Sequence, residues 1–85
     1  MIAVRMLVEG AGVHPIERYR RGKGLTQAEL AKMIGVSMAT VQRWETGTEP
    51  RPASLRRAAE ALGVDTIALL DELIAWTAQQ KGQAS

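Results

Sequence analysis

The sequence predicts a small all-α domain built from five helices. Three observations support this: Gly and Pro divide the chain into short segments, most of these segments have the apolar spacing of amphipathic helices, and only residues 2 to 8 alternate like a strand. Eighty-five residues are enough for one hydrophobic core, near the lower limit for a domain without disulfides or metal. The chain has no cysteine, so neither a disulfide nor a thiolate zinc site can form.

End signals define the first two helices. Pro15 suits the first position of a helix, where its missing N–H is not needed, and Gly24 suits a left-handed cap. They predict a helix over residues 15 to 23. Thr26 and Glu29 have the spacing of a capping box, in which each side chain accepts a hydrogen bond from the other residue's backbone amide. A second helix is expected to start there.

Similar signals place the next two helices. Ser37 is a good N-cap for a third helix, expected over residues 37 to 46. A fourth helix is expected from Pro52 or Ser54 to Leu62.

The two ends of the chain differ in how strongly their sequence predicts structure. Asp65 is a strong N-cap for a fifth helix that continues to about Gln80, and residues 81 to 85 are expected to be a frayed tail. Residues 1 to 14 are expected to form an N-terminal arm. Within it, residues 2 to 8 have high β propensity, which leaves three possibilities: a short strand across a dimer, a segment folded over the core, or a loose arm.

Charge is segregated along the chain. Residues 18 to 57 carry nine basic side chains against three acidic ones, whereas the part after Arg57 has Lys81 against four acidic residues. A basic middle segment suits a polyanion such as nucleic acid, although a charged stretch is more often a solvated face. Within this segment the expected first helix supplies four cations that could displace counterions from DNA: Arg18, Arg20, Arg21 and Lys23.

The second and third helices have the spacing of a helix-turn-helix. Their apolar positions allow the two short helices to share one core: Leu30, Ala31, Ile34, Val36, Val41 and Trp44. Gly35 lies where the chain must reverse, a position that favours a left-handed backbone. The helix over residues 37 to 46 would be the outward one. The alternative is an ordinary helical hairpin that binds nothing through that surface.

Several spaced motifs together resemble the Cro-and-repressor family of helix-turn-helix proteins, also called the xenobiotic-response-element (XRE) family. They are Gly24 to Ala31 (GLTQAELA), Gly35 to Ser37 (GVS), Arg43 to Gly47 (RWETG), and Pro52 followed by Leu55, Ala59, Leu62, Gly63 and Val64. The resemblance covers residues 16 to 70. It implies double-stranded DNA binding with the third helix in the major groove, and an ion pair between Arg20 and Glu45 that ties two helices together.

Two residues are expected to contact the DNA backbone. Gln27 begins the second helix, where free amides and the positive end of the helix dipole favour a phosphate. The alternative is a solvated glutamine. Arg51 lies in the loop after the third helix, which in the family follows the sugar-phosphate backbone. Such contacts set register and affinity, not sequence preference.

The outward helix carries the remaining candidate site residues. Arg43 is suited to O6 and N7 of guanine, with a phosphate contact as the alternative. Met38 and Ala39 can pack against thymine methyl groups, whereas Ser37 and Thr40 can reach a phosphate or a base edge. Family members often have Gln or Asn where this chain has Met38 and Ala39, so lower sequence specificity is expected.

These expectations favour a transcription regulator, specifically a repressor from a bacterium, phage or plasmid that reads a palindromic operator. The alternative is an antitoxin that binds a toxin protein as well as its own operator. An enzyme is not expected, because the sequence has no acidic or nucleophilic cluster. The lone histidine, His14, fits a helix start better than a metal site. We expect no cofactor, no signal peptide and no membrane association, and a cytoplasmic location.

A homodimer is expected through the helix from Thr66 to Gln80. The alternatives are that this helix packs back on its own domain, or that the arm over residues 2 to 8 makes the dimer instead. Apolar residues span about half of its circumference at 100° per residue, more than packing on so small a domain requires. Leu69 and Trp76 lie at the edge of this stripe and are predicted to be exposed in a monomer.

Overall fold

The computed structural model describes residues 13 to 84, and within them it contains five helices and no strand. The helices are α2 (Pro15–Gly22), α3 (Gln27–Ile34), α4 (Met38–Glu45), α5 (Pro52–Leu62) and α6 (Thr66–Ala84). The predicted all-α, five-helix class is confirmed. The arm expected over residues 1 to 14 lies outside the described residues except for its last two positions. None of the described helices combines the length and the apolar character needed to cross a membrane.

Local signals set the helix ends. Thr26 and Glu29 form the predicted capping box: the Thr26 hydroxyl accepts from the Glu29 amide at 3.0 Å, and the Glu29 carboxylate accepts from the Thr26 amide at 2.8 Å. This backbone hydrogen bond lowers the pKa of Glu29. Gly35 ends α3 with a φ of 88°, a left-handed backbone that a side chain would strain.

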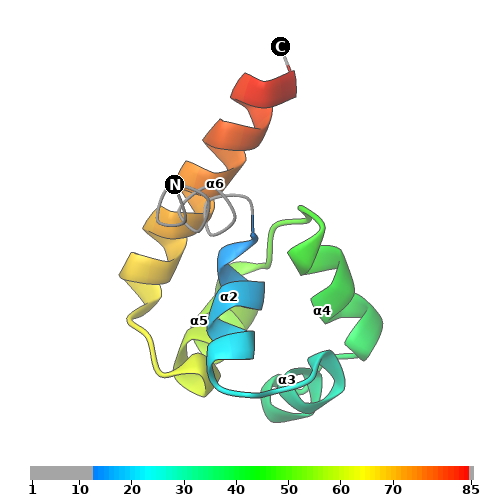
Figure 1. The fold of residues 1–85 in the computed structure, drawn as a ribbon. Coiled ribbons are helices and arrows are strands. Elements are labelled where there is room, and N and C mark those ends of the chain that lie inside the picture. The colour runs from blue at the N-terminus through cyan, green and yellow to red at the C-terminus, as the bar shows by residue number, and fades with distance from the viewer. Residues whose placement is uncertain (1–12, 85) are drawn as a thin grey trace, which may run out of the picture.

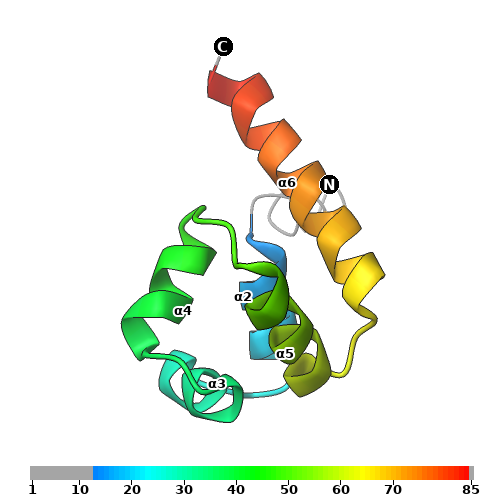
Figure 2. The same cartoon turned by 180° about the vertical axis from the view of Figure 1, so that it is seen from behind.

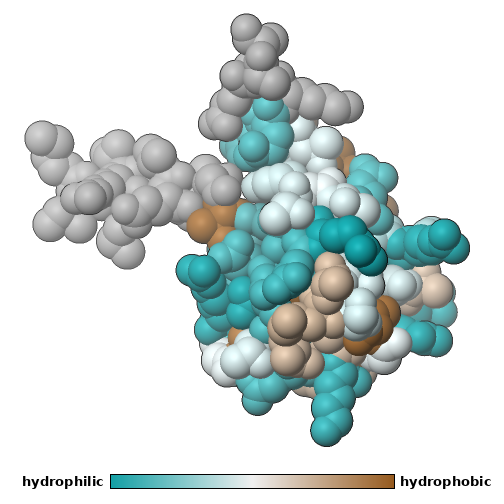
Figure 3. Space-filling model, turned by 90° about the vertical axis from the view of Figure 1, so that its right-hand side faces the viewer, coloured by the Kyte–Doolittle hydropathy of each residue, from teal (hydrophilic) through white to brown (hydrophobic). Residues whose placement is uncertain are grey.

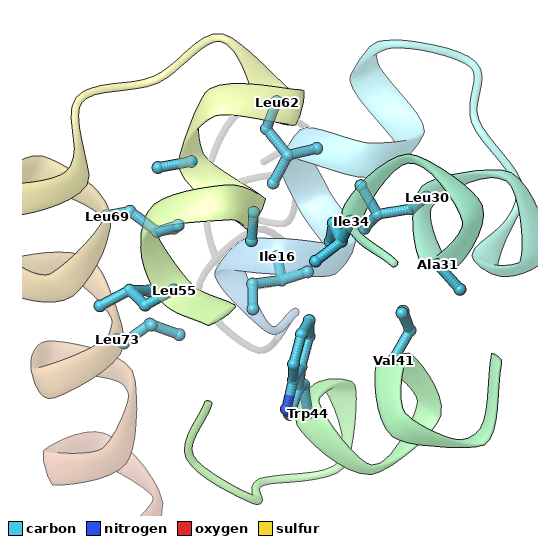
Figure 4. Close-up of a cluster of buried hydrophobic side chains, with 12 residues drawn as sticks. Ile16, Leu30, Ala31, Ile34, Val41, Trp44, Leu55, Leu62, Leu69 and Leu73 are labelled. Atoms are coloured by element: carbon cyan, nitrogen blue, oxygen red, sulfur yellow. The ribbon is translucent and has the colours of Figure 1, made fainter. Parts of the chain in front are cut away.

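The core lies where α2, α3, α4 and α5 meet, and α6 closes one side of it (Figures 1 and 4). Ile16, Leu30 and Val41 are fully buried, one from each of the first three helices. The apolar spacing predicted for α3 and α4 is confirmed, since Leu30, Ala31, Ile34, Val41 and Trp44 are buried and Val36 packs against the cluster half-buried.

Helix α6 packs with a different face from the one predicted. Leu69 is fully buried and Leu73 is 9% exposed, beside Leu55 of α5 (Figure 4). Trp76 is half-buried and its ring lies edge-to-face on His14, with centroids 4.7 Å apart. The prediction that Leu69 and Trp76 are exposed is therefore wrong, because these positions recur every three to four residues on the face that meets the domain.

The surplus apolar surface of α6 lies on another stripe. Its exposed members are Ile67, Leu70 and Ile74, with 69%, 42% and 59% of their surface accessible. The helix also continues to Ala84, four residues beyond the predicted Gln80. Its C-terminal part projects past the other helices (Figures 1 and 2).

Candidate nucleic-acid interface

Helices α3 and α4 form the two-helix unit, with α4 on the outer side of the domain (Figures 1 and 2). Val41 and Trp44 of α4 point into the core, so the opposite side of this helix faces outward. Figure 3 looks at the side on which α4 lies, and this face is largely hydrophilic with a smaller apolar area. An exposed helix on a polar face suits insertion into the major groove.

A buried ion pair fixes α4 to α2. Arg20 donates from Nε to Glu45 Oε2 at 2.7 Å and from Nη2 to Glu45 Oε1 at 3.2 Å, and its Nη1 donates to the Leu25 carbonyl at 2.8 Å. The two side chains are only 10% and 5% exposed. The hydrogen bonds to Glu45 raise the pKa of Arg20. The pairing implied by the family resemblance is confirmed, and it fixes the C-terminal end of α4 on the domain.

Gln27 starts α3 and is tied to the same pair. Its Nε2 donates to Glu45 Oε1 at 2.9 Å, and its Oε1 accepts from Gln42 Nε2 at 3.4 Å. The capping box leaves the backbone amides of Gln27 and Ala28 without an acceptor within the helix. The start of α3 therefore presents two backbone donors and the second Nε2–H of Gln27.

The first turn of α4 has its own hydrogen bonds. Ser37 Oγ accepts from the Thr40 amide at 3.1 Å and lies 2.9 Å from Thr40 Oγ1. Arg43 Nη2 donates to Thr40 Oγ1 at 3.3 Å. Since the two hydroxyls share one hydrogen bond, one O–H is left as a donor. Met38 is 47% exposed, and Ala39 and Arg43 are also exposed.

Gln42 is an exposed α4 residue that was not among the predicted site residues. At about 100° per residue, Ala39 and Thr46 point most directly away from the direction of Val41 and Trp44. Gln42 and Arg43 lie about 50° on either side of that outward direction, and Met38 lies about 90° from it. The spacing of the two buried residues was a signal sufficient to find Gln42.

The basic residues of α2 are mostly paired. Arg18 forms an ion pair with Glu72, Arg20 with Glu45, and Arg21 with Glu17 at 2.6 Å. Each arginine of α2 therefore has a carboxylate partner in the domain, while Arg18 and Arg21 keep 49% and 68% of their side-chain surface exposed. Arg51 is exposed at the N-cap of α5, in the loop after α4.

A groove of about 590 Å³ runs beside these residues between α2, α3 and α4. It is lined by Glu17, Arg20, Arg21, Thr26, Gln27, Gln42, Glu45 and Thr46. No group of three or more metal-ligating side chains occurs among the described residues. All of its lining residues are polar or charged, and it lies next to the start of α3, where free backbone amides suit a phosphate.

The fold and this surface together define a helix-turn-helix DNA-binding domain. The family model described as "Helix-turn-helix" matches residues 16–69. The chain belongs to this family, the XRE-type DNA-binding regulators, as the sequence motifs indicated. No solved structure matches the chain.

Proposed function

We propose that the protein is a transcriptional repressor of prokaryotic or phage origin that binds a palindromic operator as a homodimer. The observation that carries the proposal is the outward face of α4, which is held on the domain by the buried Arg20–Glu45 pair. Such a regulator acts on DNA in the cytoplasm.

Each candidate residue has a role in this proposal. The free amides at the start of α3 and the second Nε2–H of Gln27 bind a phosphate, and Arg51 binds a second one. Arg43 reads a guanine, and Met38 with Ala39 packs on thymine methyl groups. Ser37 and Thr40 supply the one hydroxyl donor that their mutual hydrogen bond leaves free.

The dimer is proposed to form through the exposed α6 stripe of Ile67, Leu70 and Ile74. Leu70 and Ile74 line a small groove of about 80 Å³ together with Pro50, which belongs to the loop after α4. The apolar surface therefore continues toward the DNA-binding unit. A two-fold contact there would place two α4 helices about one DNA turn, ~34 Å, apart and match a palindromic site.

Selection of bound DNA from a random pool tests the function. The expected result is an enriched two-fold symmetric sequence, and repression of a reporter that carries this sequence would separate a repressor from an activator. Recovery of no preferred sequence would contradict sequence-specific regulation.

Sedimentation tests the dimer with matched variants. Ile67→Glu with Ile74→Glu should give a monomer, because two charges replace the apolar stripe. Ala68→Glu is the control, since Ala68 is exposed about a quarter of a turn from the stripe. A wild type that is monomeric at all concentrations would contradict the dimer. Binding of a toxin protein, encoded by a neighbouring gene, to the α6 stripe would favour the antitoxin alternative.

A further inference from the structure

Four side chains form a hydrogen-bonded chain that runs from the interior to the outer face of α4. Arg20 donates to Glu45 at 2.7 and 3.2 Å, Gln27 Nε2 donates to Glu45 Oε1 at 2.9 Å, and Gln42 Nε2 donates to Gln27 Oε1 at 3.4 Å. The side chains of Arg20 and Glu45 are nearly inaccessible to solvent, whereas Gln42 is exposed. The chain therefore connects a rigid buried group to the DNA-facing surface.

The chemistry of the buried pair sets the direction of every hydrogen bond in the chain. Arginine can only donate and an ionised carboxylate can only accept, so the side of Gln27 that faces Glu45 must be its NH₂ group. Its carbonyl oxygen then faces Gln42 and can only accept. Gln42 must in turn present its NH₂ group to Gln27, and the orientation of an exposed amide is determined from within the domain.

The hydrogen-bonding groups of the Gln42 amide that Gln27 leaves free are complementary to one base, adenine. One N–H is used by Gln27. A two-point contact requires this to be the N–H that points away from the Gln42 carbonyl, since the carbonyl oxygen and the second N–H then lie side by side as an acceptor and a donor. Adenine presents the complementary pair in the major groove, since N6–H₂ donates and N7 accepts. Gln42 lies about as close to the outward direction of α4 as Arg43 does.

We propose that Gln42 is a further sequence-reading residue that makes a two-point contact with an adenine, and that Gln27 is the positioning residue that orients it. This inference rests on the proposed function, because it requires α4 to enter the major groove. The fixed amide loses less rotamer freedom on binding than a free glutamine would. The operator half-site should therefore contain an adenine read by Gln42 in addition to the guanine read by Arg43.

The first experiment compares the base preferences of wild type and Gln42→Ala by selection from a random pool. The variant should lose preference at one A·T pair of each half-site and bind the wild-type site about tenfold or more weakly, while its affinity for unrelated DNA stays unchanged. Substituting 7-deazaadenine at that position should weaken the wild type and leave Gln42→Ala unaffected. Gln79→Ala, an exposed glutamine of α6, is the control.

A second variant tests the positioning role. Gln27→Ala should reduce preference at the same A·T pair, and combining it with Gln42→Ala should reduce that preference no further. If Gln42→Ala keeps the wild-type preference, or binds every sequence equally more weakly, the inference is overturned while the proposed function stands. A wild type that selects no sequence would overturn both.

Discussion

The buried Arg20–Glu45 pair should dominate the stability of the DNA-binding unit. Glu45→Ala leaves a guanidinium that is about nine-tenths buried without its carboxylate, although its bond to the Leu25 carbonyl remains. Removing one partner of a buried pair costs about 3–5 kcal/mol. A domain of 85 residues has a total stability of about 4–13 kcal/mol at about 0.05–0.15 kcal/mol per residue. The loss is therefore a large fraction of the whole.

Urea unfolding monitored by tryptophan fluorescence measures this cost, because Trp44 is 4% exposed in the core. Glu45→Ala should lower the free energy of unfolding by about 3–5 kcal/mol and Tm by at least about 12 °C. The exposed Arg21–Glu17 pair provides the matched control. Arg21→Ala should change stability by less than about 1 kcal/mol.

A double-mutant cycle separates the pair from its surroundings. Arg20→Met with Glu45→Leu replaces both charges by apolar side chains, so the double variant should recover much of the loss that either single variant shows. A loss for Glu45→Ala no larger than that for Arg21→Ala would show that the Arg20–Glu45 pair behaves like a solvent-exposed one.

Four further predictions concern binding and pH. Arg43→Ala should cost about 1–3 kcal/mol on the preferred site and relax preference at one guanine; equal loss on all sequences in a competition assay would assign it to the backbone. Arg51→Ala should leave base preference intact and reduce the slope of log K against log salt by about 1 in salt titrations. Replacing the contacted thymine by uracil should weaken binding if Met38 and Ala39 touch its methyl group, and unchanged affinity would exclude that contact. Burial lowers the pKa of His14 from about 6.5 to about 4, so between these pH values the unfolded chain binds a proton that the folded domain excludes. The free energy of unfolding should therefore fall as the pH drops from about 6.5 to 4. His14→Asn keeps an acceptor for the Ile16 amide and should remove this pH dependence in urea unfolding.

The helix-turn-helix could be predicted from sequence because its determinants are local. The Thr26–Glu29 capping box and the Gly35 turn each act within a few residues, and the structure has both as predicted. The Arg20–Glu45 pair joins residues 25 positions apart in the chain. Spacing within one helix carries no information on such a contact, so only the family resemblance indicated it.

The ion pairs of α2 could not be predicted from the charge count either. The sequence shows that its arginines are numerous but not that Glu72, from the far end of the chain, lies beside Arg18. Gln42 is a different case, because its outward position follows from local spacing within α4 and could have been predicted from the sequence. Four of the predicted site residues of α4 and its N-cap lie in its first turn, whereas the outward position of Gln42 follows from the buried direction of Val41 and Trp44.

Helix α6 shows why a broad apolar stripe cannot by itself identify an interface. Leu69 and Leu73 form one row at a spacing of four, and Ile67, Leu70 and Ile74 form a second row beside it with similar apolar character. The row that is buried is the one that packs against α5. Leu55 then meets Leu69 and Leu73, and the second row remains exposed. The apolar pattern of α6 predicts correctly that some of its apolar surface stays exposed. Which residues form that exposed surface depends on how α6 packs against α5.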